Sequence, residues 1–536
     1  MRLLYFNWVD YLDPEGRGGG VSIYQRNVIE SLSGAPDIKL TFLCAGLSHD
    51  PVSTAPRWQP LPPGRESHAA RRFELVNSGT LAASHNSFGH EAQVDHPETR
   101  AAFFAFLEAE GPFDIVHFNN LEGLPASVMT LKERFPETRI VYSIHNYYAA
   151  CPQVNLWHQE RETCVDFEGG LKCATCLPRE ARTDAETVRR AFAVAETLKS
   201  AGLKPGQRGF DLAFRLGTRL AKAALPVAAL ASPGARDVAA FPQRVTAPPQ
   251  EEGPFERLEP AHARYERRRR EITQLINSNA DLILAVSTRA GEVASRFGLD
   301  RSKIAVEYIG TKHAELFRRT RPARRVLAED GTLTLGYLGY MRRDKGFYFL
   351  LDALEDLPSR MAAKLHLVFA ARAGAPEIMA RLKALGGRFA SVSHADGYSH
   401  ATLDEVLERV DVGLIPVMWE DNLPQVAIEM HARHIPLVTA NLGGASELGN
   451  SPPMTFEAGN IHAFRKVISD VLAERVDFDT YWLGARAPVS LETHRDRLLA
   501  HYNAIMGIQQ YDEPAETNEP NLDMPIELDA MRALRA

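Results

Sequence analysis

The sequence predicts an α/β protein with two doubly wound, Rossmann-like domains that face a central cleft. Short apolar, β-rich runs alternate with helix-like segments, and this alternation occurs in two separate blocks. The chain has 536 residues, which is too long for one ordinary domain. Its apolar fraction of 45% and charged fraction of 24% are typical of a soluble globular protein.

The first block predicts an N-terminal domain over residues 1–319. Runs that are apolar on both faces and bounded by turn residues are typical of a parallel sheet covered by helices. The predicted strands are Leu3–Phe6, Ile38–Cys44, Asp114–Phe118, Arg139–His145, Leu282–Val286 and Ile304–Ile309.

The second block predicts a further domain over residues 328–482, after a short polar linker that contains Pro322. Its strands are expected at Leu333–Tyr340, Leu365–Ala370, Ala390–Ser393, Val412–Val417, Pro436–Ala440 and Met454–Phe456. Apolar residues at helical spacing between these runs indicate amphipathic helices. We expect a C-terminal helix over 483–510 to cross back to the N-terminal domain, followed by an acidic tail over 511–536.

A stretch rich in Ala, Arg and Pro, over about 178–270, interrupts the first block and predicts a mostly helical insertion. Within it, residues 209–231 combine a leucine series with Arg215 and Arg219. This pattern fits peripheral contact with an anionic membrane, and a helix packed on its own domain is the alternative. The longest uninterrupted apolar stretch, Ala223–Ala231, is shorter than the roughly 20 residues of a spanning helix. The expected location is therefore cytoplasmic or peripheral on the inner face of a membrane.

The charge balance excludes a strongly basic protein. Lys and Arg number 61 against 68 Asp and Glu, for a net charge of −7. Because a nucleic-acid footprint is normally basic, a general polynucleotide binder is disfavoured.

Several predicted strand ends carry polar residues, and in a parallel sheet the carboxyl ends of strands form the ligand-facing edge. The glycines at 18–20 follow the first strand, where backbone N–H groups can approach a phosphate, although an ordinary turn is the alternative. His117 and His145 each end a strand, and Asn119 and Asn146 follow them. A single such histidine is often structural, but two at equivalent ends favour a polar ligand.

The second block carries cations and carboxylates at comparable places. Arg342, Arg343 and Lys345 follow the strand at 333–340 and suit a diphosphate, with a solvated basic turn as the alternative. Asp421 lies in an acidic loop, and Glu429 lies eight residues later in a predicted helix. Two such carboxylates can contact two parts of one ligand, including the vicinal hydroxyls of a sugar.

Four of the five cysteines, Cys151, Cys164, Cys173 and Cys176, fall within one loop-like segment. The C-x-x-C pair is half of a common zinc site, and in a cytosolic protein close thiols favour a metal over disulfides. A structural zinc is one hypothesis, and free loop cysteines are the other.

The chain resembles a retaining glycosyltransferase of the GT-B fold, from family 4 or "group 1". The resemblance rests on GGGVSIYQRNVIESL, DIVHFNN, YSIHNYYAACPQVNLW, LGYMRRDKGFYFLLDAL and EDNLPQVAIEMHARHIPLVTANLGGASEL. It covers both blocks but neither the insertion nor the acidic tail. It implies transfer of a sugar from a nucleotide-diphosphate sugar to a glycan or lipid-linked acceptor, in cell-surface polysaccharide or glycolipid biosynthesis.

The resemblance also implies roles for individual residues. In the catalytic set, Asp421 faces the donor sugar, His145 lies beside the transferred sugar and Lys345 neutralises the diphosphate. Glu429 binds the nucleotide ribose. The other donor-binding positions implied are Gly19, Gly20, Asn422 and Leu423, with Arg342 and Arg343, and His117, Asn119 and Asn146 lie on the acceptor side.

Two positions depart from the family pattern. The first acid is Asp421 where Glu is usual, with Glu420 adjacent, and Tyr340 replaces an arginine after the strand glycine. We expect Arg342 or Arg343 to supply the missing charge. Electrostatic stabilisation of the leaving diphosphate needs no metal, so no cofactor is expected for catalysis. The alternatives are an epimerase or hydrolase of the same fold, or a non-catalytic protein that binds nucleotide sugars.

Overall fold

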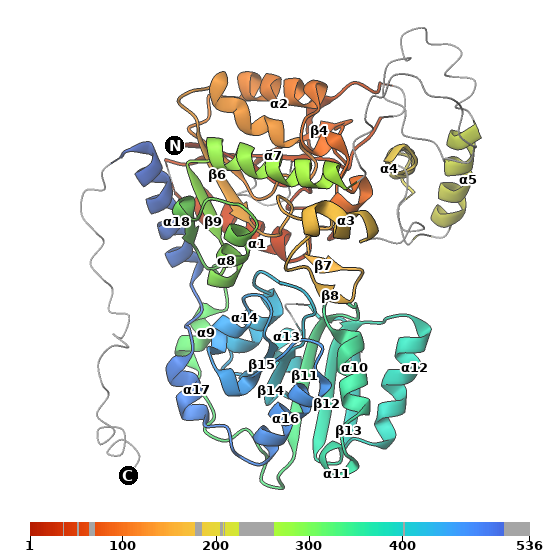
Figure 1. Ribbon diagram of the computed structural model, residues 1–536, viewed down its shortest axis with the longest axis vertical. Coiled ribbons are helices and arrows are strands. Elements are labelled where there is room, and N and C mark those ends of the chain that lie inside the picture. Colours follow the sequence, from red (N-terminus) through yellow and green to blue (C-terminus); the bar gives the residue numbers. More distant parts are fainter. Residues whose placement is uncertain are drawn as a thin grey trace.

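The computed structural model confirms two α/β domains, which lie one above the other along the long axis of the molecule (Figure 1). It describes residues 1–35, 37–50, 53–63, 70–176, 185–203, 207, 209–223, 262–399 and 402–508. The predicted acidic tail and residues 224–231 of the suggested membrane segment lie outside these ranges.

The first domain is built on an eight-stranded sheet of order β10-β9-β6-β5-β1-β2-β4-β3. Every pairing is parallel except β3 with β4. The strands are β1 (Arg2–Phe6), β2 (Lys39–Ala45), β3 (Arg57–Pro60), β4 (Arg71–Val76), β5 (Ile115–Phe118), β6 (Arg139–Ile144), β9 (Leu282–Ala285) and β10 (Ile304–Val306). Helices α1 (Gly19–Ser33), α2 (Pro97–Glu110), α7 (Ala263–Asn279), α8 (Thr288–Arg296) and α9 (Ala314–Arg319) belong to the same part of the chain.

The sequence does not predict β3 and β4, which end one side of the sheet. β3 is nowhere buried, and β4, which lies between β2 and β3, begins with Arg71 and Arg72. Polar residues are common in an edge strand such as β3, because one side of it faces solvent. These strands therefore lack the continuous apolar run by which the central strands were predicted.

The second domain contains a six-stranded, fully parallel sheet of order β13-β12-β11-β14-β15-β16. Its strands are β11 (Leu333–Tyr340), β12 (Leu365–Arg372), β13 (Ser391–Asp396), β14 (Val412–Ile415), β15 (Leu437–Ala440) and β16 (Thr455–Phe456). Its helices are α10 (Phe347–Glu355), α11 (Ser359–Ala362), α12 (Pro376–Ala384), α13 (Leu403–Leu407), α14 (Gln425–His431), α15 (Ser446–Gly449) and α16 (Ile461–Leu472).

The insertion contributes two described helices, α4 (Ala185–Ser200) and α5 (Phe210–Ala223). Gly217 of α5 lies directly against Val194 of α4, and α4 is tied to the first domain by a hydrogen bond from Arg189 to the Gly79 carbonyl at 2.9 Å. Before the insertion, a two-stranded hairpin of β7 (Trp157–His158) and β8 (Glu162–Thr163) precedes α3 (Leu171–Thr175). No described helix is both long enough and apolar enough to cross a membrane.

The chain returns to the first domain at its end. After α17 (Phe478–Gly484), helix α18 (Leu491–Met506) packs against α1, and Figure 1 shows it beside the first domain. The returning segment pairs with the outgoing one, because the Thr311 N–H donates to the Val489 carbonyl at 2.9 Å and Thr311 forms a parallel bridge with Ser490. The two chain crossings between the domains therefore lie side by side.

Candidate active site

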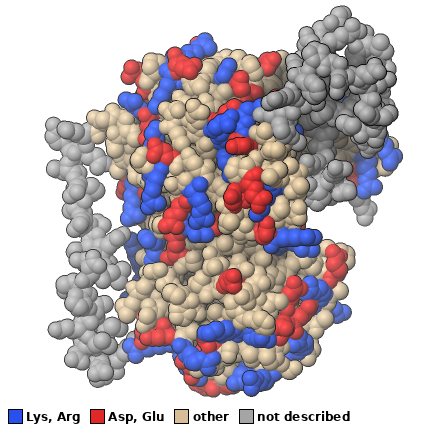
Figure 2. Space-filling model, viewed as in Figure 1, with Lys and Arg blue, Asp and Glu red and all other residues tan. Residues whose placement is uncertain are grey.

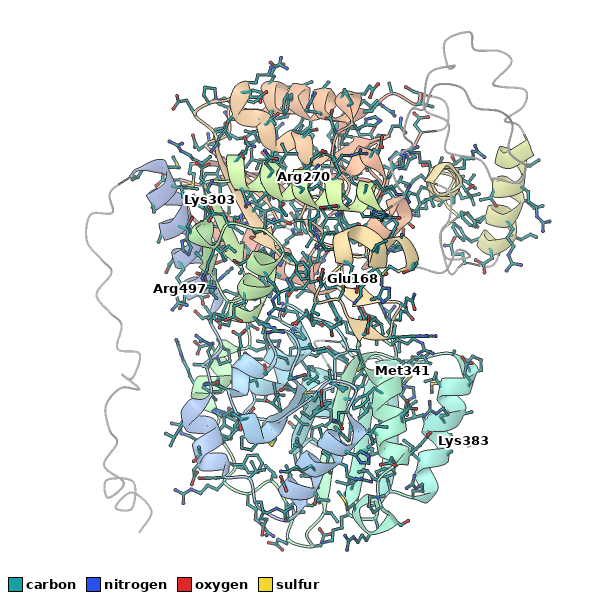
Figure 3. The ribbon with its side chains drawn as sticks, viewed as in Figure 1. Glu168, Arg270, Lys303, Met341, Lys383 and Arg497 are labelled. Carbon is teal, nitrogen blue, oxygen red and sulfur yellow. The ribbon has the colours of Figure 1, made fainter. Side chains whose placement is uncertain are left out.

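A cavity of about 590 Å³ is lined by both domains. The second domain contributes the carboxyl ends of β11, β12 and β14 and the start of α14, and the first contributes the start of α1 and His145. Figure 3 shows Met341, which directly follows β11, at the edge of the second domain that faces the first. In Figure 2, acidic and basic side chains are interspersed over the visible face of both domains. The cavity thus lies where doubly wound sheets bind ligands.

The glycine segment brings the two domains close together at the cavity. Gly19 and Gly20 begin α1 and both line the cavity. Gly19 has a φ of +53°, in the left-handed region that favours glycine. A Cβ atom on Gly20 would lie 3.2 Å from Cγ of Gln425 in α14. A larger residue at position 20 would therefore require the Gln425 side chain to shift.

Lys345 and Asp421 form an ion pair in the cavity wall. The Lys345 Nζ lies 2.5 Å from Oδ2 of Asp421 and 5.2 Å from the centre of the Trp419 ring. The adjacent Glu420 points elsewhere: it pairs with Arg289 and accepts the Gly443 N–H at 2.9 Å. Asp421, rather than Glu420, is therefore the carboxylate that faces the cavity.

Arg342 and Arg343 do not line the cavity, in contrast to the sequence-based expectation. The Arg342 Nε donates to Oδ1 of Asp344 at 2.9 Å, and the Arg343 guanidinium lies 4.6 Å from the centre of the Tyr348 ring. Both side chains are largely exposed.

Two arginines that the sequence reasoning missed line the cavity instead. Arg372 ends β12, directly beside Tyr340 of β11, and Arg26 lies in α1. Neither guanidinium has an ion-pair partner within the described part of the chain. Arg372 could have been found from the sequence, because it follows the predicted strand Leu365–Ala370 at the same edge as the other candidates.

Glu429 lies in α14 on the same wall of the cavity. Its carboxylate accepts a hydrogen bond from the Tyr398 hydroxyl at 3.1 Å. Burial raises the pKa of Glu429 to about 7, against the opposing effects of Tyr398 and Arg433. Because hydrogen-bond donors favour the ionised form, a ligand with hydroxyl groups would lower this pKa.

The residues after Asp421 are held by the first domain. The Ser287 hydroxyl donates to the Asn422 carbonyl at 2.7 Å, and the Asn422 amide donates to the Ile144 carbonyl at 2.8 Å. Asn422 and Leu423 both line the cavity. These two hydrogen bonds therefore fix the loop at Asn422 to the first domain.

His145 lines the cavity as a neutral imidazole. Burial, and secondarily the charge of His494, lower its pKa to about 3. Its Nε2 lies 3.2 Å from Oδ1 of Asn119, whose amide nitrogen donates to the Phe6 carbonyl. Since Oδ1 can only accept, the proton of His145 is on Nε2, and Nδ1 remains as a hydrogen-bond acceptor.

The three predicted acceptor-side residues, His117, Asn119 and Asn146, do not line the cavity. His117 is fully buried, with Nδ1 2.7 Å from the Tyr502 hydroxyl and Nε2 2.7 Å from the Ser143 hydroxyl. Asn119 positions His145 from behind, and the Asn146 amide donates to Glu122 at 2.7 Å. His117 is covered because α18 crosses over this strand end, a contact 385 residues apart in sequence.

The predicted zinc site is not supported. Within the described residues, which include all four cysteines of the cluster, no group of three or more His, Cys, Asp or Glu side chains is arranged to hold a metal. The Cys164 thiol donates to the Asp166 carbonyl at 3.5 Å, and the Cys176 thiol to Oε1 of Gln153 at 3.3 Å. Burial raises the pKa of Cys164 to about 11 and that of Cys173 to about 12. The alternative reading, buried loop thiols, fits these contacts.

Comparisons with known proteins agree with this geometry. Residues 332–474 match the family model described as "Glycosyl transferases group 1". No curated protein sequence matches the chain.

Similar solved structures share the fold at low sequence identity. HepE from Anabaena in complex with UDP has a TM-score of 0.50 and 13% identity, over 94% of this chain and 100% of that chain. Sucrose-phosphate synthase from Thermosynechococcus elongatus has a TM-score of 0.50 and 15% identity, over 94% and 96%. The N-terminal domain of trehalose-6-phosphate phosphatase from Candida albicans has a TM-score of 0.52 and 10% identity, over 94% and 97%. The chain thus has the GT-B fold, and its second domain matches the glycosyltransferase group 1 family.

Proposed function

We propose that this protein is a retaining glycosyltransferase that moves a sugar from a nucleotide-diphosphate sugar to a glycan or lipid-linked acceptor in cell-surface polysaccharide or glycolipid biosynthesis. The observation that carries the proposal is the Lys345–Asp421 ion pair beside Glu429 in one cavity. All three residues lie in the segment that matches the glycosyltransferase model.

The charges in the cavity fit the parts of such a donor. The Glu429 carboxylate suits the vicinal hydroxyls of a ribose. Lys345 and Arg372 supply positive charge for a diphosphate, and Asp421 is the carboxylate nearest to Lys345. UDP is the ligand named for the HepE structure, which supports a nucleotide in this cavity.

The reaction breaks the bond between the anomeric carbon and the diphosphate oxygen, and the bonding electrons leave with the diphosphate. Positive charge develops on the sugar and negative charge on the leaving group. Lys345 and Arg372 stabilise the leaving group electrostatically, so we expect transfer to proceed in the presence of a metal chelator. The acceptor hydroxyl attacks from the face that the diphosphate leaves, which retains the configuration, and its proton passes to the departing diphosphate oxygen. Nδ1 of neutral His145 accepts a hydrogen bond from a sugar hydroxyl during this step.

Nucleotide release tests the proposal against its alternatives. Thermal stabilisation by UDP-, GDP- and ADP-sugars first identifies the donor, because a bound ligand stabilises the folded state by mass action. A transferase then releases nucleotide mainly when an acceptor is present. A hydrolase releases it without an acceptor, an epimerase converts the donor sugar, and a binding protein does neither. Absence of stabilisation by every donor would argue against the proposal.

Contact with an anionic membrane is a further part of the proposal, and helix α5 supports it. Leu212, Leu216 and Leu220 are 65%, 49% and 69% exposed, and Arg215 and Arg219 on the same helix are also exposed. An apolar stripe with flanking cations suits a surface of anionic lipids. Vesicles of phosphatidylcholine with and without phosphatidylglycerol test this contact. We expect co-sedimentation only with the anionic vesicles and its loss in Leu216→Glu, and equal behaviour of both proteins would contradict it.

A further inference from the structure

The loop at residues 419–424, which carries Asp421, is bonded to the first domain as well as to its own. Two hydrogen bonds fix its Asn422: one from the Ser287 hydroxyl to its carbonyl, and one from its amide to the Ile144 carbonyl. Both partners belong to the first domain. The position of this loop therefore depends on how closely the two domains dock.

Arg289 makes the strongest of these contacts. Its Nε donates to Glu420 at 2.9 Å, and its Nη2 donates to the other carboxylate oxygen. Glu420 is only 2% exposed, and the Gly443 N–H of the second domain also donates to it. A buried carboxylate with three donors is locked in one orientation. Because Arg289 holds Glu420 away from the cavity, the next residue, Asp421, faces Lys345 and the cavity.

A second carboxylate of the second domain, that of Glu447, contacts the segment of the first domain that contains Arg289. Glu447 accepts the backbone N–H of Thr288 at 3.0 Å and that of Arg289 at 2.7 Å, and the Tyr308 hydroxyl also donates to it. Arg289 thus binds two carboxylates of the second domain, one through its side chain and one through its backbone. Mutation of the side chain would remove only the contact with Glu420.

We propose that Arg289 is a positioning residue, which couples docking of the first domain to the arrangement of the donor site. It does not line the cavity, and it acts on the ligand only through Glu420 and the loop at 419–424. The predicted effect on nucleotide binding rests on the proposed function, whereas the predicted effect on domain docking does not.

Loss of the Arg289 side chain leaves Glu420 buried with one donor in place of three. Truncation of one partner of a buried, hydrogen-bonded charge pair typically weakens an association by about 30-fold or more. The expected response of Glu420 is to turn toward water, which opens the cleft and releases the loop. Nucleotide affinity then falls even though no group that contacts the nucleotide has changed.

The experiment compares Arg289→Ala and Arg289→Lys with the wild type and with Arg381→Ala. Arg381 is a matched control, because it also contacts carboxylates, those of Asp352 and Glu355, but all three lie within the second domain. Three measurements are made: the radius of gyration by X-ray scattering without ligand, amide hydrogen exchange of residues 419–424, and titration with UDP, GDP and ADP.

For Arg289→Ala we expect a larger radius of gyration, faster exchange in the loop and at least about tenfold weaker nucleotide binding. Arg289→Lys should lie between this variant and the wild type, because lysine keeps the charge but lacks the two-pronged geometry. Arg381→Ala should match the wild type in all three. Wild-type values for Arg289→Ala, or an expanded protein with unchanged loop exchange, would overturn the proposal.

Failure of the proposed function has a different signature. A wild type that binds none of the three nucleotides contradicts the proposed function, whereas the scattering and exchange comparisons still decide the role of Arg289. If Arg289→Ala does not fold, Arg289→Lys and Glu420→Gln carry the same comparison with a smaller perturbation.

Discussion

Tyr24 of helix α1 lies 3.1 Å, through its hydroxyl, from Nε2 of His494 in helix α18, although 470 residues separate them. The other ring nitrogen of His494 lies 3.0 Å from the Glu307 carboxylate. Tyr24 also lines the cavity, and its ring centre is 4.9 Å from that of His145. The returning helix therefore supports the floor of the candidate active site from outside.

Replacement of His494 by alanine should destabilise the protein. It leaves the buried Tyr24 hydroxyl without a partner and removes one of the two histidines that contact the Glu307 carboxylate, the other being His501, at a cost of about 1–3 kcal/mol. Urea unfolding measures this loss, with Arg495→Ala as the control, because Arg495 pairs with its neighbour Asp496 at the surface. Equal midpoints for the two variants would show that the contact of α18 with Tyr24 contributes nothing.

Lys345→Ala should lower kcat/KM by about 10²–10³-fold, because a positive charge on the leaving diphosphate acts mainly in the transition state. Lys345→Arg should recover part of the rate. The control is Lys466→Ala, since Lys466 pairs with Asp470 on the exposed face of α16. An unchanged kcat in Lys345→Ala would exclude a role in leaving-group stabilisation.

Arg372→Ala should weaken binding of a nucleoside diphosphate about tenfold and leave the corresponding nucleoside unaffected, because the lost contact is with the phosphates. Isothermal titration with UDP and uridine measures the difference, or with the pair that the donor screen identifies. The same change at Arg342 should have an effect of less than about twofold, because that side chain faces solvent beside Asp344. Equal losses for UDP and uridine would place Arg372 beside the base instead.

Glu429 should make nucleotide affinity depend on pH. Its pKa of about 7 means that the carboxylate is protonated below neutrality in the free protein, whereas it must be ionised to accept two ribose hydroxyls. Affinity should therefore fall as pH drops below about 7, by at most about tenfold per pH unit for one proton. Titrations from about pH 5.5 to about pH 8, a range that brackets the pKa of Glu429, measure this slope.

Glu429→Gln serves as the control for this pH dependence. Glutamine keeps the size of the side chain but does not titrate, so its nucleotide affinity should be weaker and flat over the same range. A wild-type slope that persists in Glu429→Gln would assign the titration to another group.

The sequence places four candidate residues near the carboxyl edges of the sheets, and all four line the cavity. Lys345, Asp421 and His145 follow or end predicted strands, and Glu429 lies in the helix after the acidic loop. Their roles remain predictions. Arg372 also ends a strand, β12, and lines the same cavity.

Sequence reasoning was insufficient where distant segments decide the outcome. His117 also ends a strand, yet Tyr502 of α18 covers it, and no local pattern shows where a helix near the end of the chain will pack. Similarly, the choice between Glu420 and Asp421 depends on Arg289, which lies 131 residues away from Glu420. Such contacts depend on the docking of domains, which periodicity and spacing do not describe.

The paired chain crossings at Thr311 and Ser490 limit the relative motion of the domains. A single linker would let one domain twist and slide freely relative to the other, whereas two parallel crossings that are bonded to each other leave mainly rotation about one line. Rotation about that line then returns the same residues to the same partners each time the domains close. Under the proposed function, donor entry and product release can therefore alternate with assembly of the site without a search for the correct alignment.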